Sequence, residues 1–466
     1  MELWITWWNT VSLLRPAFSR RRTFFWFVLA LGAFCVRRDL LGVTSFVRAF
    51  GLQERCYHRL LHFFHSNAIK LDLLSQLWLG IIIKLFPLYR IDGRPVLVLD
   101  GFKNPKEGRK MPGVKLLHQE SESNSKPLYI MGHSFQVFGV LCCVGNYYFC
   151  VPVCARIHEG IVRSNRDKRT LIDKANEMLA SVCAERQFVL LADAYYANGK
   201  MIRALRKRSS HLVTRVRSTT TAYQPAPVPK VRKRGRPKKY GQKLKLQKCF
   251  ASSKSKFQSL ASPVYGERNV MIRYLVLDLL WRPAGEMVRF VLVDHPARGR
   301  MILLCTDLSQ DPADIILQYA LRFKIEVSFK QAVHSLGTFG YHFWMADMRP
   351  LKRRNGNQYL HRTSEQYRRH VTRKMRAYHL YVQTGVIAQG MLQYLAMTKE
   401  KLVWDYFGSW IRTIRPGVLP SEMIVSEALK NSLPEFLRFG TVATSWRKFL
   451  RENVDTERSE NSRSAA

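Results

Sequence analysis

Two acidic residues of this sequence stand at the ends of short apolar runs. Pro-Val-Leu-Val-Leu precedes Asp100, and Phe-Val-Leu-Leu-Ala precedes Asp193. Runs of this length and composition predict buried β-strands over residues 95–100 and 188–193. In open α/β sheets, ligands bind beyond the carboxyl ends of the strands, where both of these carboxylates would lie. The two aspartates therefore predict a metal site with two carboxylate ligands.

A third acid is expected on a helix. The sequence predicts a helix over 311–335, in which Tyr319, Arg322 and Glu326 follow one another at spacings of three and four. These spacings place the three side chains on one helical face, and Lys330 lies four residues further along that face. Such a face is either exposed to solvent or turned towards an anionic site. Glu326 is therefore the candidate for a third carboxylate ligand.

The order of the predicted elements defines the fold class that we expect. Strand 96–100 is followed by a hairpin of strands 129–144 and 147–155, helix 169–186, strand 188–193, helix 197–207 and strand 211–216. This is the layout of a ribonuclease H-like sheet, an α/β fold with a mixed sheet and helices on both faces. His133, at the start of the second strand, is expected to make a structural hydrogen bond.

The rest of the chain is expected to flank or interrupt this sheet. An all-helical DNA-binding and dimerisation region is predicted over 1–90. The first part of the catalytic domain is expected over 91–217 and the second part over 309–400, separated by a basic linker with a β-rich insertion over 218–308. A helical region with a disordered end is expected over 401–466. Within the first region, 40–50 and 53–64 predict a helix-turn-helix unit, whose second helix would present Arg55 and Arg59 to DNA. An ordinary helical hairpin with a solvated basic face is the alternative.

Two features of the 218–308 segment suggest further contacts with DNA. Arg234-Gly235-Arg236-Pro237 is similar to the core of an AT-hook, whose arginines enter the narrow minor groove of A·T-rich DNA. A solvated basic loop is the alternative. Trp281 is expected at the tip of a hairpin, where it would either pack or stack on a flipped base.

The composition agrees with a nucleic-acid partner. The 466 residues include 75 Lys and Arg but only 34 Asp and Glu, giving a formal net charge of +41. A charge of this size indicates a polyanionic partner, and nucleic acid is favoured over an anionic membrane. The apolar run 24–36 is too short for a confident membrane span and predicts a core helix. The nine cysteines contain no Cys-x-x-Cys pair and are expected to be buried, reduced thiols.

The three acids and their neighbours resemble a known enzyme family. Asp100 and Asp193, with Tyr-x2-Arg-x3-Glu ending at Glu326, are similar to the DDE transposases of bacterial insertion sequences, in the group with a β insertion before the glutamate. The resemblance covers roughly residues 40 to 400. One position departs from it, because the family signature has a lysine where this sequence has Val333. Lys330, one helical turn after Glu326, is the possible substitute.

The resemblance implies the chemistry of the site. Such enzymes use two divalent metal ions, Mg²⁺ or Mn²⁺, on a ribonuclease H-like core. Asp100 would bridge both ions, while Asp193 and Glu326 would each hold one. Tyr319 and Arg322 would contact the DNA backbone near the bond that is cut.

We therefore expect a transposase that binds double-stranded element ends and target DNA, cuts them, and transfers strands. It would act as a homodimer or higher assembly, in the cytoplasm at the nucleoid. A catalytically inactive DNA-binding relative and a ribonuclease H-fold nuclease without strand transfer are the alternatives, and a membrane protein is the weakest one.

Overall fold

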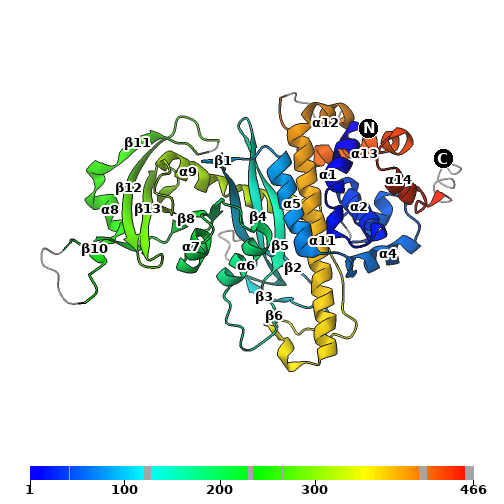
Figure 1. The fold of residues 1–466 in the computed structure, drawn as a ribbon, viewed down its shortest axis with the longest axis horizontal. Helices are drawn as coiled ribbons and strands as arrows, with labels where there is room; N and C mark the ends of the chain where they lie inside the picture. The colour runs from blue at the N-terminus through cyan, green and yellow to red at the C-terminus, as the bar shows by residue number, and fades with distance from the viewer. Residues whose placement is uncertain (41, 120–126, 229–234, 265, 409–416, 457–466) are drawn as a thin grey trace.

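The computed structural model describes residues 1–466 except 41, 120–126, 229–234, 265, 409–416 and 457–466. Its architecture is mixed α/β, with a large mixed sheet and helices on both faces. A layer of helices lies at one end of the molecule and a lobe of strands at the other, with the central strands between them (Figure 1).

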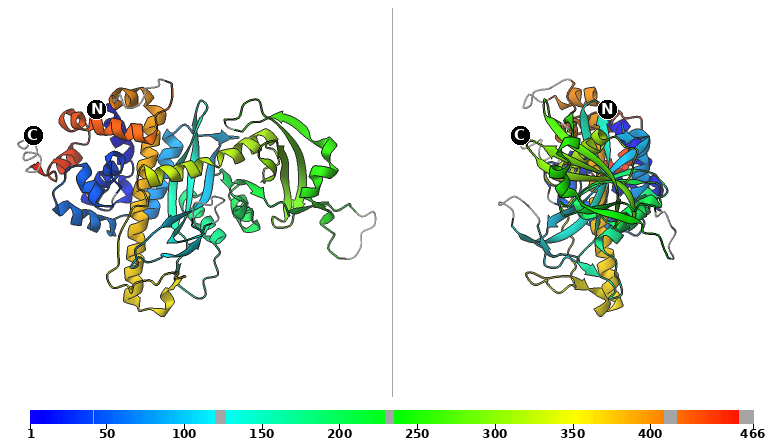
Figure 2. Two further views of the ribbon diagram at one scale, coloured as in Figure 1. Left: turned by 180° about the vertical axis from the view of Figure 1, so that it is seen from behind. Right: turned by 90° about the vertical axis from the view of Figure 1, so that its left-hand side faces the viewer.

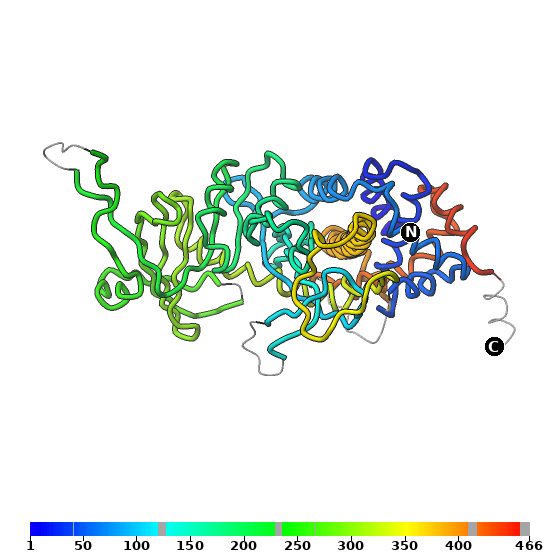
Figure 3. The backbone as a smooth tube through the Cα atoms, turned by 90° about the horizontal axis from the view of Figure 1, so that it is seen from below, coloured from blue at the N-terminus to red at the C-terminus, as the bar shows by residue number. Residues whose placement is uncertain are grey.

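The helical layer is built from both ends of the chain. The N-terminal helices are α1 (Glu2–Ser12), α2 (Arg21–Val36), α3 (Thr44–Ala49), α4 (Arg55–Phe64) and α5 (Leu71–Leu85). The C-terminal helices are α11 (Glu365–Thr398), α12 (Glu400–Phe407), α13 (Glu422–Phe439) and α14 (Thr444–Arg451). Helix α2 packs on α11 and α13, and α1 packs on α13. The N-terminal and C-terminal helices consequently lie side by side (Figures 1 and 3).

Helix α11 connects this layer to the sheet. It is 34 residues long and packs on strand β5 with one part of its surface and on α2 with another. Figure 2 shows it running between the N-terminal helices and the central strands. Its middle part is buried on all sides, so Gln383 and Gln389 there bond to buried partners, the carbonyls of Val153 and Ser328.

The sheet contains strands of both directions. Its members are β1 (Arg90–Ile91), β2 (Arg94–Pro105), β3 (Lys115–His118), β4 (Tyr129–Val144), β5 (Tyr147–Ile157), β7 (Val189–Ala192), β8 (His211–Val216), β9 (Thr221–Pro225), β10 (Tyr240–Lys245), β11 (Gln258–Ala261), β12 (Met271–Trp281), β13 (Glu286–His295) and β14 (Gly299–Cys305). The order is β10-β9-β12-β13-β14-β8-β7-β2-β4-β3, and β5 pairs with β4. The pairs β2–β7 and β7–β8 are parallel, and the pairs of β4 with β2 and β5 are antiparallel.

The β-rich insertion does not form a sheet of its own. Strand β14 pairs antiparallel with β8, so β9 to β14 extend the central sheet at its edge. A separate two-stranded sheet joins β6 (Ile161–Val162) to β15 (Gln358–Tyr359). The remaining helices are α6 (Leu171–Cys183), α7 (Gly199–Arg206), α8 (Leu246–Ser252), α9 (Pro312–Leu321) and α10 (Lys324–His334).

Three predicted elements differ from the structure. Strand β2 does not end at Asp100 but continues to Pro105, because residues 101–105 keep pairing with β4. The predicted helix 311–335 is two helices, α9 and α10, with a break at Arg322 and Phe323. The helices of the expected helix-turn-helix unit are α3 and α4, and α3 is shorter than predicted.

The apolar run near the N-terminus is a core helix, as predicted. Helix α2 is buried at nearly every position from Phe24 to Val36, against α11 and α13. Within the described part of the chain, no helix has the length and hydropathy that a membrane span requires. The nine cysteines are free, and all but Cys143 are buried.

Helix α11 passes so close to α5 that one position must be glycine. A Cβ atom on Gly390 would lie 2.3 Å from Cζ2 of Trp78, a fully buried side chain whose Nε1 donates to the carbonyl of Pro152. Because the indole cannot move aside, Gly390→Ala should lower the free energy of unfolding by about 1–3 kcal/mol, even after the gain in helix propensity. Chemical denaturation followed by circular dichroism would measure the change.

The matched control is Gly356→Ala. Gly356 is exposed, and an added Cβ would meet no atom within 4 Å. Its stability should change by no more than about 0.5 kcal/mol. Equal effects of the two substitutions would contradict the tight packing at Gly390.

Candidate active site

The parallel pairing of β2 with β7 brings the two predicted aspartates together. Leu99 is paired with Ala192 in the last register position of the two strands. The next residue on each strand is an aspartate, Asp100 and Asp193. Adjacent strands lie about 4.8 Å apart, so the two carboxylates leave the backbone side by side.

The alternation of side chains along a strand decides which face the acids share. Val96 and Val98 belong to one apolar cluster with Val189 and Leu191, whereas Leu97 and its neighbours belong to the cluster on the other face. With a period of two, Asp100 and Asp193 continue the first set. This cluster also contains Ile315, Ile316, Leu321 and Ile325 of α9 and α10. The acids therefore lie on the face that these two helices cover.

Arg322 lies between the aspartates and the third acid. Its Nη1 donates to Oδ2 of Asp100 at 2.9 Å, and its Nη2 donates to Oε1 of Glu326 at 3.0 Å. The guanidinium carbon is 5.9 Å from the centre of the Tyr319 ring. The break between α9 and α10 leaves Arg322 and Glu326 on the same side, so the predicted spacing does bring them together.

The three predicted acids line one cavity. Its volume is about 910 Å³, and its walls include Asp100, Asp193 and Glu326. Its lining also includes Lys103, Lys115, Gln136, His158 and Glu159. Tyr319 and Arg322 do not line this cavity, although Arg322 contacts two of its acids, Asp100 and Glu326.

The charge of Asp100 is affected by burial and by its neighbours. Burial raises the pKa of its carboxyl to about 6, and repulsion from Asp193 and Glu326 acts in the same direction. The Arg322 guanidinium and a hydrogen bond of 2.7 Å from the Gly101 amide lower the pKa in part. Arg322 therefore offsets only some of the cost of holding this carboxylate ionised beside two others.

The donor set fits hard divalent cations by its chemistry. Carboxylate oxygens are the ligands that Mg²⁺ and Mn²⁺ prefer, and a cation would also relieve the repulsion that raises the pKa of Asp100. Among the described residues, however, no three side chains of His, Cys, Asp or Glu are already close enough to hold one ion. The Arg322 guanidinium bridges Asp100 and Glu326 through one oxygen of each carboxylate.

Lys330 does not take the place of the lysine that the resemblance led us to expect. It is exposed and does not line the cavity of the acids. Val333 packs against the hydrophobic core, so a lysine there would have to leave that packing. The basic residues that do line the cavity are Lys103 on β2 and Lys115 on β3.

These two lysines were missed by the sequence analysis. Lys103 lies three residues after Asp100, and its Nζ donates to the carbonyl of His118; Lys115 is 3.6 Å from the Glu159 carboxylate. The signal that would have found Lys103 is the continuation of its strand beyond Asp100.

Of the two roles considered for Trp281, packing in the hairpin and stacking on a flipped base, the structure favours packing. The side chain is 6% exposed and belongs to the hydrophobic core at the end of β12. It therefore has no free face for a base. Arg282, the next residue, lies over the Tyr223 ring at 4.4 Å and helps to close the hairpin.

The remaining predicted contact residues lie away from the acids. Arg234 is outside the described residues, and Arg236 is exposed in the linker between β9 and β10. Arg55 is exposed on α4, whereas Arg59 is half-buried and donates to Oδ1 of Asn453 at 3.1 Å. His133 makes structural hydrogen bonds, as predicted, with the Tyr341 hydroxyl and the Pro112 carbonyl.

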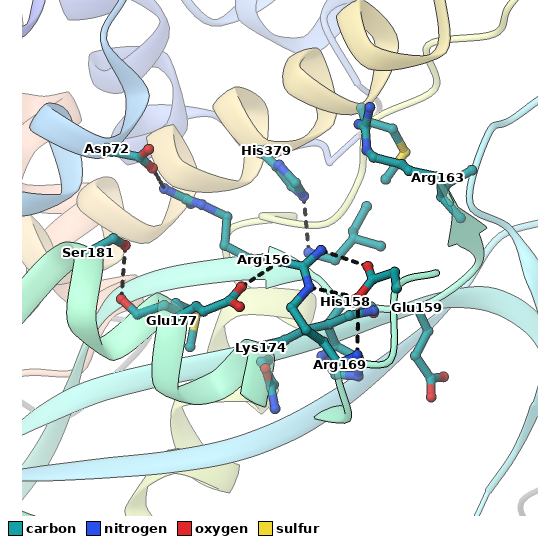
Figure 4. A pocket seen from close by; sticks show the side chains of 16 residues that line it. Asp72, Arg156, His158, Glu159, Arg163, Arg169, Lys174, Glu177, Ser181 and His379 are labelled. Atoms are coloured by element: carbon teal, nitrogen blue, oxygen red, sulfur yellow. Dashed lines mark hydrogen bonds and ion pairs between the residues drawn. The ribbon is translucent and has the colours of Figure 1, made fainter. Parts of the chain in front are cut away.

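A second, smaller cavity adjoins the first one (Figure 4). Its volume is about 400 Å³, and it shares Gln136, His158 and Glu159 with the cavity of the acids. The charged side chains around it largely pair with one another: Arg169 bonds to Asp167 and Glu177, and Arg156 lies 3.6 Å from Asp72. This pairing favours a structural role at the junction of α6, β5 and α11.

Comparison with known proteins gives one family match. The family model described as "DDE superfamily endonuclease" matches residues 15–271, more than half of the chain. The matched segment includes Asp100 and Asp193 and ends before Glu326. A search of curated proteins found no match. One solved structure that is similar is a piggyBac transposase synaptic complex with hairpin DNA, at 12% identity and a TM-score of 0.36, covering 93% of this chain and 76% of that chain.

The raised pKa of Asp100 predicts a pH-dependent effect of Asp100→Asn. Between pH 4 and pH 6 the unfolded carboxyl is ionised while the folded one still holds its proton, so wild-type stability falls as the pH rises. The amide removes this loss. From pH 4 to pH 7.5, without metal, the variant should therefore gain on the order of 2 kcal/mol of unfolding free energy relative to wild type.

Urea denaturation at several pH values would measure this difference. Asp173→Asn is the matched control, because hydrogen bonds from Lys200 and Thr170 lower the pKa of Asp173 to about 2. Its titration lies below the pH range tested, so its effect on stability should be constant there. A flat difference for Asp100→Asn would show that the carboxyl is not perturbed.

Proposed function

This chain belongs to the DDE superfamily endonuclease family, and from that premise we propose that it is a transposase of a bacterial insertion sequence. It would bind the ends of a mobile element, cut DNA there, and join the ends to target DNA. The observation on which the proposal depends most is that Asp100, Asp193 and Glu326 line one cavity. The family match includes both aspartates, whereas the assignment of Glu326 rests on the Tyr-x2-Arg-x3-Glu motif and on the geometry of the cavity.

The strand order supports a ribonuclease H-like core for this activity. The strands β5-β4-β2-β7-β8 form a continuous part of the sheet, with the first three antiparallel to their neighbours and the last three parallel. This is the arrangement expected from the element order in the sequence. The contacts of Arg322 with Asp100 of β2 and with Glu326 of α10 support Glu326 as the third acid of the site.

We assign the metal ligands to the three carboxylates, with Mg²⁺ or Mn²⁺ as the ions and two ions per site. Bound there, such ions would activate the attacking oxygen and stabilise the leaving one during phosphodiester cleavage. Asp100, Asp193 and Glu326 would together hold these ions. The carboxylate ligands explain why the site is acidic although the whole chain is strongly basic.

The other side chains of the site would position DNA. Arg322 has a fork of donors that suits a phosphate, and it already lies against Asp100 and Glu326. The guanidinium carbon of Arg322 lies over the Tyr319 ring. Lys103 and Lys115 line the same cavity and would attract the phosphate backbone. We propose that these lysines serve the role that the signature lysine, here Val333, cannot.

The proposed partner is double-stranded DNA, both element ends and target. The formal net charge of +41 supports this partner. Joining two ends requires that two sites act together, so we propose a homodimer or higher assembly, working on chromosomal DNA in the cytoplasm. A DNA-binding relative without catalytic activity is the second candidate, and Val333 together with the Arg322 bridge is the observation in its favour.

The proposal predicts metal-dependent cleavage of a labelled duplex with the element's own terminal repeat and flank. Asp193→Asn and Glu326→Gln should each lower the cleavage rate at least about a hundredfold, because each removes a ligand charge from the metal site. Both variants should still bind the duplex. The measurement is product formation in Mg²⁺ or Mn²⁺, with binding measured separately.

Glu159→Gln is the matched control, since Glu159 lines the same cavity but pairs with Lys115. It should retain cleavage within a few-fold of wild type. Cleavage that survives Asp193→Asn and Glu326→Gln would refute the site assignment. Binding by the wild type without any cleavage would favour the inactive relative.

A further inference from the structure

A cleft in the helical layer is lined mainly by basic side chains. Its volume is about 670 Å³, and it lies between the first turn of α2, the exposed side of α4, and α14. Five cationic side chains line it, against one carboxylate, that of Glu452: Arg21, Arg22, Arg55, Arg59 and Lys448. It shares no residue with the cavity of the three acids.

The cations of this cleft are not neutralised within the described part of the protein. No ion pair joins any of the five to an acidic side chain there. Arg21 donates to Oγ of Ser445 at 2.6 Å and Arg59 to Oδ1 of Asn453 at 3.1 Å, and both acceptors are neutral. Their positive charge therefore remains available to a bound anion.

The first turn of α2 adds to this positive charge. The helix is 16 residues long and begins with Arg21 and Arg22, with no acidic residue in the first turn and no side-chain cap. Cations at a helix N-terminus oppose the helix dipole. Two arginines at this position cost stability that a bound anion would offset.

Beside the cleft, the segment before α4 is hydrogen-bonded to the segment after α14. The amide of Gln53 donates to the carbonyl of Asn453, and the amide of Asp455 donates to the carbonyl of Gly51. Leu52 and Val454 form an antiparallel bridge. Phe25 of α2 packs on Phe449 of α14 under the cleft, with 5.5 Å between the ring centres. The cleft is therefore a built feature, in which α14 is held in place against α2 and α4.

We propose that this cleft is a second DNA-binding site, which grips the phosphate backbone of a duplex at a distance from the cutting site. The inference rests on the proposed function for the identity of the polyanion. Cations distributed over three helices suit a run of successive phosphates better than one small anion. Helix α14 is part of this binding site, because it contains Lys448 and also Ser445, which accepts the hydrogen bond from Arg21. Figures 1 and 3 show these helices at the end of the molecule opposite the β-rich lobe.

The test is a binding titration of the full-length protein without divalent metal. The probe is a fluorescent duplex of arbitrary sequence, about 30 base pairs long, titrated at several salt concentrations. The triple variant Arg22→Glu, Arg55→Glu and Lys448→Glu reverses three exposed cations of the cleft. It should bind at least about tenfold more weakly than wild type near 0.1 M salt, and the slope of log K against log salt should fall by about 0.9 for each phosphate that the variant no longer neutralises.

The matched control is Lys84→Glu, Lys248→Glu and Lys401→Glu. These lysines are exposed, line neither the cleft nor the cavity of the acids, and produce the same change in net charge. The control should weaken binding several-fold less and leave the salt slope close to that of wild type. Equal losses in the two triple variants would overturn the proposal, because only net charge would then matter.

Two further measurements separate this proposal from the proposed function. Circular dichroism shows whether the charge-reversed triple variant is folded. If it is unfolded, the triple variant Arg22→Gln, Arg55→Gln and Lys448→Gln takes its place and must lower the slope of log K against log salt. Under the proposed function, cleavage in Mn²⁺ depends on the three acids. If Asp193→Asn abolishes cleavage but leaves salt-dependent binding intact, the result supports a cutting site at the acids and a separate site for binding. A wild type that binds but never cuts would refute the transposase and leave the cleft supported, whereas a wild type that does not bind duplex DNA would refute the cleft.

Discussion

The parallel pairing of β2 with β7 is the contact on which the acidic site depends. These strands are far apart in sequence, and their register places Asp100 and Asp193 at the same level of the sheet. A shift of one residue would turn one of the two carboxylates to the opposite face of the sheet, where α5, α6 and α11 pack. The buried side chains on both faces of each strand prevent such a shift, because each would have to leave its own apolar cluster.

Three carboxylates that line one cavity repel one another, and the positive charge of Arg322 offsets part of this repulsion. The break between α9 and α10 places this residue where its two terminal nitrogens reach Asp100 and Glu326. The compensation is partial, since burial and repulsion still raise the pKa of Asp100. The uncompensated negative charge of such a site favours the binding of a cation, which agrees with the metal-dependent cleavage that we propose.

The basic and acidic parts of the protein are separated in space. The three acids line a cavity beside β2, β7 and α10, and the basic side chains of the cleft lie in the helical layer formed by both ends of the chain. This separation allows a polyanion to be held by one surface while a single phosphodiester group is presented to the other. The long helix α11 packs on both the helical layer and strand β5, and so connects the layer to the sheet that contains the aspartates.

The sequence by itself determined the elements that contain the acids, because burial patterns with periods of two and 3.6 are local properties of a few residues. The buried strands that lead to Asp100 and Asp193, and the helical spacing from Arg322 to Glu326, could be predicted in this way, whereas the continuation of β2 to Pro105 could not. Only the tertiary structure decided that Trp281 is buried, that Lys103 rather than Lys330 lines the cavity, and that α14 packs beside α2. Those outcomes depend on which distant segments pack together, and the free energy of such packing is shared among contacts that no local pattern records.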